Sequence, residues 1–258
     1  GYLANKGVID FAGGLVVHAT CGIGALVIAM YLGKREGFLT KPMPPHNRTM
    51  VMIGASMLWV GWFGFNAGSA VAADSNAGMA MLVTHISAAI GALTWMAIEW
   101  VKSGKATIIG VATGMVAGLA TITPASGTVG PAGAMLIGLL AGSVCFYATQ
   151  IIKSTLKIDD SLDVFPVHGI GGILGILMLS LVGKPEGFAG SGSSGFDNTS
   201  LSQLLIQAEG IIIICIWTAI TTYIILKTLN IFVDLRVSRE EEEEGLDISL
   251  HNEQGYNL

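Results

Sequence analysis

The sequence predicts an all-α protein that crosses a membrane several times as a bundle of helices. Hydrophobic residues make up 52% of the 258 residues and charged residues only 12%, at a mean hydropathy of +0.67. A soluble globule of this size needs more charge to solvate its surface. The 35 glycines are spread through the apolar runs, as in membrane helices that approach one another closely. We therefore expect a polytopic transmembrane bundle.

Seven segments are long and apolar enough to be spans. A spanning helix needs about 20 mainly apolar residues to cross a hydrocarbon core roughly 30 Å thick. The predicted spans cover residues 9–32, 49–66, 77–101, 107–122, 131–151, 164–182 and 201–232. Together they define a transmembrane domain over residues 1–236, followed by an acidic cytoplasmic tail over residues 237–258. Since the first residue is not Met, we expect the chain to begin partway through a longer protein.

Positive charge gives an orientation. Short cytoplasmic segments keep an excess of Lys and Arg. Eleven of the 13 Lys and Arg residues follow the first, third, fifth or seventh span, whereas Lys6 and Lys184 fall on the opposite side. The N-terminus of this chain is therefore predicted outside, the C-terminus in the cytoplasm, and the Gly/Ser-rich segment Gly183–Ser200 in an extracellular loop.

Small residues indicate packing rather than chemistry. Gly110, Gly114 and Gly118 lie four residues apart, as do Gly138 and Gly142, and this spacing predicts tight helix contacts.

The cysteines also suggest no chemistry. Cys21, Cys145 and Cys215 stand singly in apolar stretches, so we expect small packing residues and neither a disulfide framework nor a metal site. The net charge of −5 comes largely from the acidic tail, and no patch for nucleic acid follows.

Ionisable side chains inside a span are costly and mark candidate functional sites. Asp10 opens the first predicted span, and His18 follows eight residues later, two turns along the same helical face. Asp163 opens the sixth predicted span, and His168 follows five residues later. A single buried histidine is more often a packing residue than a working one. However, these two lie on oppositely directed spans, as in an inverted repeat with a site at its interface.

Four stretches resemble the signature sequences of the Amt/Mep/Rh ammonium transporter family, in order and at similar spacing. They are DFAGGLVVH (Asp10–His18), GWFGFNAGS (Gly61–Ser69), TPASGTVG (Thr123–Gly130) and DVFPVHG (Asp163–Gly169). Members of this family have eleven spans in two inverted five-helix repeats plus a last helix, and they assemble as trimers. The resemblance implies a chain equivalent to spans five to eleven, in the bacterial inner membrane.

The resemblance also implies roles for single residues. His18 and His168 match the twin pore histidines, and Trp62 matches a pore-lining tryptophan. Phe65 matches one of two stacked phenylalanines that gate the outer mouth of the pore. The partner phenylalanine and an outer-site tryptophan belong to spans that this chain lacks, so we expect an incomplete outer recognition site.

Further residues match the outer site and its surroundings. Ser69 matches a hydroxyl at the outer ammonium site, and Asp10 matches an acid below it that helps recruitment and holds the local backbone. Asp163 matches an acid that is mostly structural. Two positions depart from the family pattern: Val83 stands where many members have Asn, and Pro166 where some have Gly.

Three other histidines are not matched to the pore. His85, in the third span, is expected to be a helix-contact residue, whereas His46 and His251 fall in polar segments and are expected to be solvated.

The implied chemistry follows from desolvation. Moving an ammonium ion into an apolar channel costs several kcal/mol, and an aromatic contact returns only about 2 kcal/mol. Neutral ammonia loses roughly 2–7 kcal/mol of hydrogen bonding when unpaired, which imidazole nitrogens can restore. We therefore expect the ion to lose its proton at the outer site and ammonia to pass the two neutral imidazole rings.

The acidic tail suggests a contact with partner proteins. A glutamate run is commonly a solvated face, but this tail resembles the family region that contacts neighbouring subunits and binds the PII signalling protein. Expected partners are thus ammonium or ammonia, membrane lipid, two further copies in a homotrimer, and PII, with no cofactor.

An ammonium sensor and an Rh-type gas channel stay open as alternatives. An enzyme built on two His and two Asp lacks a nucleophile or a set of metal ligands at compatible depths, so we expect none.

Overall fold

The computed structural model describes residues 1–183 and 200–256, and the regular elements among them are all helical. Seven helices within the described residues are long and apolar enough to cross a membrane, so the predicted all-α membrane fold is confirmed. The elements are α1 (Tyr2–Asn5), α2 (Thr20–Leu32), α3 (Arg48–Gly68), α4 (Ser75–Ser103), α5 (Ile108–Ile122), α6 (Pro131–Gln150), α7 (Ile170–Val182), α8 (Ser200–Leu229), α9 (Arg239–Glu244) and α10 (Leu246–His251). Most of the predicted extracellular loop, residues 184–199, lies outside the described residues.

Shorter helical turns extend four of these helices. A π-helical turn over Gly14–Ala19 leads into α2, and a second over Phe165–Gly169 leads into α7. A third, over Ile151–Thr155, follows α6, and a 3₁₀ turn over Thr123–Ala125 follows α5. Such π turns are rare and are frequently found at functional sites.

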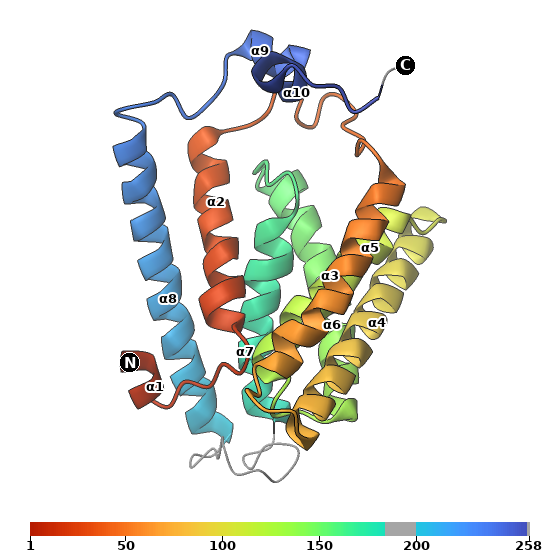
Figure 1. Ribbon diagram of the computed structural model, residues 1–258, viewed down its shortest axis with the longest axis vertical. Coiled ribbons are helices and arrows are strands. Elements are labelled where there is room, and N and C mark those ends of the chain that lie inside the picture. The colour runs from red at the N-terminus through yellow and green to blue at the C-terminus, as the bar shows by residue number, and fades with distance from the viewer. Residues whose placement is uncertain (184–199, 257–258) are drawn as a thin grey trace.

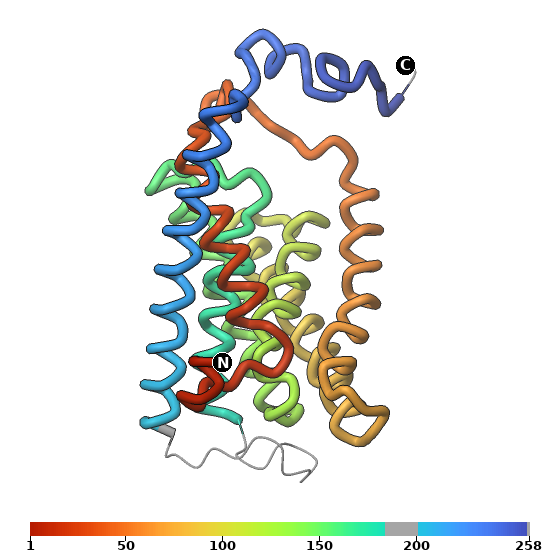
Figure 2. Tube along the Cα trace, turned by 60° about the vertical axis from the view of Figure 1, so that its left-hand side comes forward, coloured from red at the N-terminus to blue at the C-terminus, as the bar shows by residue number. Residues whose placement is uncertain are grey.

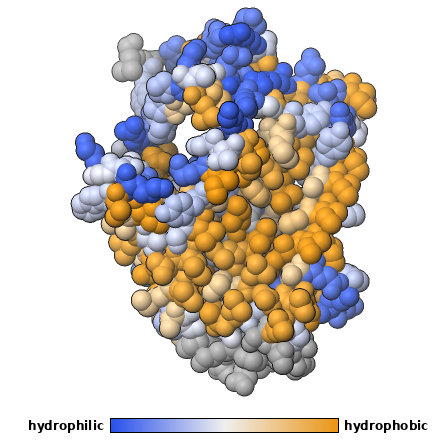
Figure 3. Space-filling model, turned by 180° about the vertical axis from the view of Figure 1, so that it is seen from behind, coloured by the Kyte–Doolittle hydropathy of each residue, from blue (hydrophilic) through white to orange (hydrophobic). Residues whose placement is uncertain are grey.

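The spans lie side by side along one axis, with α8 at one flank and α2 between α8 and α7 (Figure 1). The tail helices α9 and α10 lie across one end of the bundle, above the connection between α2 and α3 (Figure 2). Apolar side chains cover the middle of the molecule, and hydrophilic ones gather at the tail end (Figure 3). A lipid bilayer requires this distribution because its core offers no hydrogen-bonding partners.

Local sequence explains where several spans begin. The Asn47 side chain accepts a hydrogen bond from Met50 N and caps α3. Asp74 caps α4 and Thr107 caps α5 in the same way. Each cap satisfies a backbone N–H that has no partner within its own helix. Pro131 opens α6 at the first helical position, where its fixed φ suits the helix.

The tail is anchored by its charges. Arg236 donates to the carbonyl oxygens of Leu32 and Lys34 and forms an ion pair with Glu242 at 2.9 Å. Glu242 also accepts a hydrogen bond from Glu36 N, and this bond, together with Arg236, lowers the pKa of its carboxyl. The acidic run is therefore not only a solvated face: at Glu242 it attaches the tail to the end of α2.

Close contacts between α4, α5 and α6 occur at the predicted glycines. A Cβ atom added at Gly142 would lie 2.7 Å from the carbonyl oxygen of Gly91, and one at Gly138 would lie 2.6 Å from that of Ser87. A Cβ at Gly118 would collide with the same Ser87 carbonyl. The prediction that these glycines mark tight helix contacts is confirmed, because a side chain at any of them would push the helices apart.

This packing predicts a large difference between two Gly→Ala substitutions. Gly118→Ala should lower the thermal unfolding midpoint of the purified protein, because overpacking costs about 1–3 kcal/mol. Gly78→Ala is the matched control, since a Cβ there meets nothing within 4 Å and Ala favours the helix. Unfolding followed by circular dichroism in detergent measures both, and equal midpoints would contradict the packing described here.

Candidate functional site

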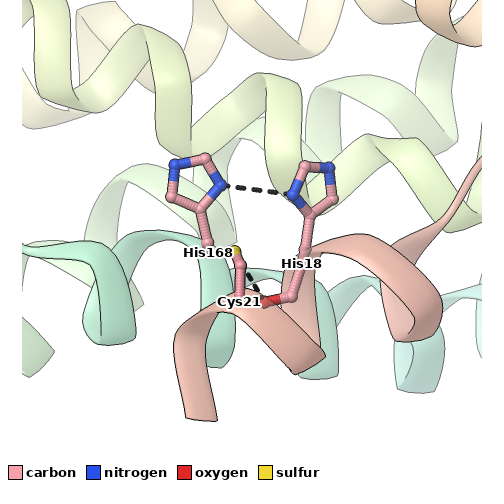
Figure 4. Close-up of side chains that lie close together, drawn as sticks. All are labelled: His18, Cys21 and His168. Carbon is pink, nitrogen blue, oxygen red and sulfur yellow. Dashed lines mark hydrogen bonds between the residues drawn. The ribbon is translucent and has the colours of Figure 1, made fainter. Parts of the chain in front are cut away.

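Two histidines from opposite halves of the chain meet inside the bundle. His18 lies in the π turn before α2, and His168 lies in the π turn before α7. Their Nδ1 atoms are 3.2 Å apart, within hydrogen-bonding distance, and their ring centroids are 5.3 Å apart. The rings lie side by side with the two Nδ1 atoms facing each other (Figure 4). A single hydrogen bond thus joins the two residues that the sequence singled out.

Two glycines allow this meeting. Gly22 lies four residues after His18, and a Cβ added to it would collide with the backbone of Gly169. Gly172 lies four residues after His168, and its Cβ would lie 2.7 Å from both Gly14 O and the Cβ of His18. The two helix starts therefore touch backbone to backbone in an arrangement that is alike on both sides, as an inverted repeat requires.

The Thr123 hydroxyl contacts the His18 ring at Nε2, on the side away from His168. Its Oγ1 donates to Leu119 O at 2.8 Å, accepts from Trp62 Nε1 at 2.9 Å, and lies 3.2 Å from His18 Nε2. All three side chains are buried. Sequence reasoning missed Thr123 as a site residue, although it is the first residue of the third quoted stretch.

These hydrogen bonds assign the imidazole tautomers. A threonine hydroxyl has one proton, and here it goes to Leu119, so His18 Nε2 must be the donor to Thr123. His18 Nδ1 is then an acceptor, and His168 Nδ1 must carry the proton between the rings. His168 Nε2 is left with a free lone pair. The hydrogen bond between the rings therefore runs from His168 Nδ1 to His18 Nδ1. This direction is assigned from the surrounding hydrogen bonds and not from either ring alone.

A cavity of about 660 Å³ adjoins the two rings. Trp62 stacks against His18 at a centroid distance of 5.3 Å, and Phe65 lies tilted at 6.0 Å. The remaining lining is mostly apolar and consists of Val17, Cys21, Gly54, Met57, Leu58 and Gly61. The structure thus brings His18, His168, Trp62 and Phe65 together around one apolar space.

Asp10 does not lie where the sequence placed it. The helical region begins at Gly14 rather than at Ile9, and Gly13 takes φ +113° just before it. Asp10 therefore cannot share a helical face with His18, and that prediction is wrong. Its carboxylate instead accepts the backbone N–H groups of residues 13–16, which stabilises the positive end of the helix dipole. The four hydrogen bonds at a helix start are the reason why Asp10 stays outside the helix.

The matching acid in the other half is Asp160, not Asp163. Asp160 precedes His168 by eight residues, the same spacing as Asp10 and His18, and accepts Phe165 N at 2.7 Å. Asp163 takes φ +58° before the helix and forms an ion pair with Lys153 at 2.8 Å. Burial raises the pKa of the Asp163 carboxyl, and Lys153 only partly offsets this. The eight-residue spacing was the signal that could have identified Asp160.

The loop before the second π turn is held by an ion pair. Asp159, whose side chain is 1% exposed, binds Arg35 through the backbone N, Nε and NH2. Burial alone raises the pKa of the Asp159 carboxyl, but the hydrogen bonds and charge of Arg35 outweigh burial and lower it. The carboxylate stays charged, and the loop that precedes His168 is tied to the end of α2.

The remaining predicted residues lie around the cavity or away from it. Ser69 ends α3 one turn beyond Phe65, and its hydroxyl donates to Phe65 O. His85 contacts the rings of Trp59 and Phe63 on α3, so its prediction as a helix-contact residue is confirmed. Cys21 was predicted to be a packing residue, and this is wrong: its side chain is exposed to the cavity because it lies one turn after His18 on the same face.

Comparison with known proteins gives a consistent match. The model of the Ammonium Transporter Family matches residues 1–256. An "Ammonium transporter" of Aquifex aeolicus is 44% identical over 258 residues, which cover 100% of this chain and 59% of that protein. "Ammonium transporter Amt1" of Archaeoglobus fulgidus is 45% identical, over 99% of this chain and 64% of its own length. This chain thus spans less than two thirds of either relative.

A solved structure shows the same arrangement of helices. The crystal structure of Saccharomyces cerevisiae Mep2 superposes with a TM-score of 0.86 at 40% identity, over 93% of this chain and 55% of that one. A structure described as "Sensor Amt Protein" superposes with a TM-score of 0.89 at 32% identity, over 97% of this chain and 62% of that one.

The position of Thr123 predicts that its hydroxyl matters more for stability than the hydroxyl of Thr113 in α5. Thr123→Val should leave the buried N–H groups of Trp62 and His18 without an acceptor, at about 1–3 kcal/mol each. Thr113→Val is the matched control, since the Thr113 hydroxyl bonds only to Ile109 O one turn back. Thermal unfolding midpoints of both variants test this, and a Thr123→Val midpoint no lower than that of Thr113→Val would contradict it.

Proposed function

We propose a function for this chain from its family: the chain belongs to the Ammonium Transporter Family, and it supplies the pore core of a protein that moves ammonium across a membrane. The observation that supports this most directly is the hydrogen-bonded imidazole pair beside an apolar cavity. Such a pair offers a neutral molecule one lone pair where the surrounding walls offer none. A multi-pass bundle of seven apolar helices provides the path through the bilayer.

The proposed mechanism separates the ion from its proton. The low dielectric of the cavity excludes ammonium by several kcal/mol of desolvation, but it admits ammonia once an acceptor and apolar contacts are available. His168 Nε2, which carries the free lone pair, accepts a hydrogen bond from ammonia as it passes. The hydrogen bond between the rings is also a route for relaying the released proton, which would make transport move charge. Potassium has no proton to release, so the same pore rejects it.

The outer end would prepare the substrate. Phe65 lines the cavity beside His18, and Ser69 provides a hydroxyl one turn further out. Asp10 lies near this end, and its oxygens are occupied by backbone N–H groups. Asp10 therefore acts by holding the turn that carries His18 rather than by direct contact with the ion.

Location and assembly follow from the same family. Lys and Arg residues outside the tail support an orientation with the N-terminus of this chain outside and the tail in the cytoplasm, in a bacterial inner membrane. Family resemblance supports a homotrimer, in which part of the exposed apolar surface contacts neighbouring subunits instead of lipid.

A sensor is the second candidate, because the solved structure described as "Sensor Amt Protein" superposes on 97% of this chain. A sensor would bind ammonium at the same site and pass on a signal with little net movement. Measurement of transport by the purified protein in liposomes distinguishes the two functions.

Removal of one pore imidazole tests the proposed mechanism. His168→Ala should lower ammonium transport about 5- to 140-fold or abolish discrimination against potassium, because lost buried hydrogen bonding costs about 1–3 kcal/mol and 1.4 kcal/mol is a factor of ten. His85→Ala is the matched control: it also removes a histidine from a span, but one that contacts α3 and does not line the cavity. Currents on a supported membrane measure both. Unchanged ammonium current and unchanged selectivity in His168→Ala would refute the mechanism.

The tail provides a separate test of regulation. Deletion of residues 237–258 should weaken binding of purified PII protein, since it removes α9, α10 and the Glu242 anchor. Isothermal titration measures binding, and size-exclusion chromatography with light scattering checks that assembly is unchanged. PII binding of undiminished affinity by a truncated protein that still assembles would count against the tail as the PII site.

A further inference from the structure

Cys21 and the two pore histidines form a group of potential metal ligands. One nitrogen of each ring and Cys21 Sγ all lie within 4.8 Å of one another, and within residues 1–183 and 200–256 no other such group of three converges. Cys21 lies on α2, and its side chain lies between those of the two histidines (Figure 4). Its sulfur is held only by a weak contact with His18 O at 3.3 Å. We propose that this group binds a soft, univalent metal ion, Cu⁺ or Ag⁺, within the pore.

The distances fit such an ion after a small adjustment. In zinc sites, metal–nitrogen bonds are about 2.0–2.1 Å and metal–sulfur bonds about 2.3 Å long, so a nitrogen and a sulfur on one ion of that size lie at most about 4.4 Å apart. The observed spread of up to 4.8 Å exceeds this by a few tenths of an ångström. Rotation of the Cys21 side chain into the cavity closes that gap, because the adjoining space of about 660 Å³ is open.

The surroundings of His18 suit a metal ligand. A histidine that binds a metal usually donates its other ring N–H to an oxygen, which fixes its orientation and tautomer. His18 Nε2 already donates to Thr123 Oγ1, so its Nδ1 lone pair is presented toward His168 and Cys21. The orientation of the His18 ring therefore supports a metal site independently of Cys21.

Charge and ligand type select the class of ion. Thiolate and imidazole together favour Cu⁺ and related soft ions over Mg²⁺ or Ca²⁺, which prefer oxygen. A univalent ion, one thiolate and two neutral imidazoles give a site of zero net charge. Zn²⁺ with the same ligands would leave one positive charge in an apolar span, which is costly.

Binding balances in protons and charge. The S–H bond of Cys21 breaks and an S–metal bond forms, so one proton leaves to solvent for each ion bound. The proton on His168 Nδ1 moves to Nε2, which leaves both Nδ1 atoms free as ligands and both rings neutral. No oxidant or reductant is involved. On the proposed transport function, the ion would replace the hydrogen bond between the rings and close the pore.

Titration of purified protein with Ag⁺ in chloride-free buffer tests the site directly. The expected result is one high-affinity site, with about one proton released per ion, and at least a tenfold loss of affinity in Cys21→Ser, which keeps the size of the side chain but removes the soft ligand. His168→Ala should also weaken binding. Cys215→Ser, in α8, is the matched control and should bind Ag⁺ as the unaltered protein does. Equal affinity of Cys21→Ser and the unaltered protein would overturn the proposal.

Transport in liposomes separates this proposal from the proposed function. Ag⁺ at a concentration that saturates the site should inhibit ammonium uptake by the unaltered protein and by Cys215→Ser, but not by Cys21→Ser, each relative to its own uptake without Ag⁺. Binding without any transport would disprove the proposed function and leave the metal site standing. Transport that Ag⁺ inhibits equally in all three proteins would place the inhibitory ion elsewhere and overturn the proposal of pore closure.

Discussion

The contact between the beginnings of α2 and α7 is the constraint on which the rest of the site depends. At Gly22 and Gly172 the two backbones touch with no side chain between them, which places His18 and His168 within one hydrogen bond. Leu or even Ala at either glycine would separate the two turns by more than that bond tolerates. The apolar cavity, the position of Trp62 and the direction of the imidazole pair all follow from this approach.

Few polar groups lie within the membrane-spanning part of the site, and those around the two histidines have defined partners. Asp10 and Asp160 satisfy N–H groups where the two helical regions begin, where the helix dipole favours negative charge. Thr123 satisfies Trp62 and His18 in the interior. Unpaired groups at these depths would each cost several kcal/mol. Within this hydrogen-bonded group of described residues, the acceptor left open is His168 Nε2, which is suited to a passing ligand.

Much of this fold could be predicted from composition and pattern. Apolar length gave the seven spans, and two histidines on oppositely directed spans indicated a site at a repeat interface. Irregular backbone could not be predicted, because the hydropathy of a segment does not depend on its backbone conformation. A positive φ at Gly13 places Asp10 outside the helix. Cys21 was judged by its apolar neighbours in sequence, whereas its exposure depends on a cavity formed by α3. Thr123 was missed because its partners are 61 and 105 residues away.

The long separation between the two histidines also has a consequence for biosynthesis. They are 150 residues apart, and ribosomes add about 5–20 residues per second. The helix that carries His18 therefore enters the membrane roughly 8–30 seconds before its partner is made. During that interval the glycine face of α2 and the imidazole of His18 must rest against lipid, the insertion machinery or early helices. We expect the insertion of α7 to be the event that completes the pair of imidazoles.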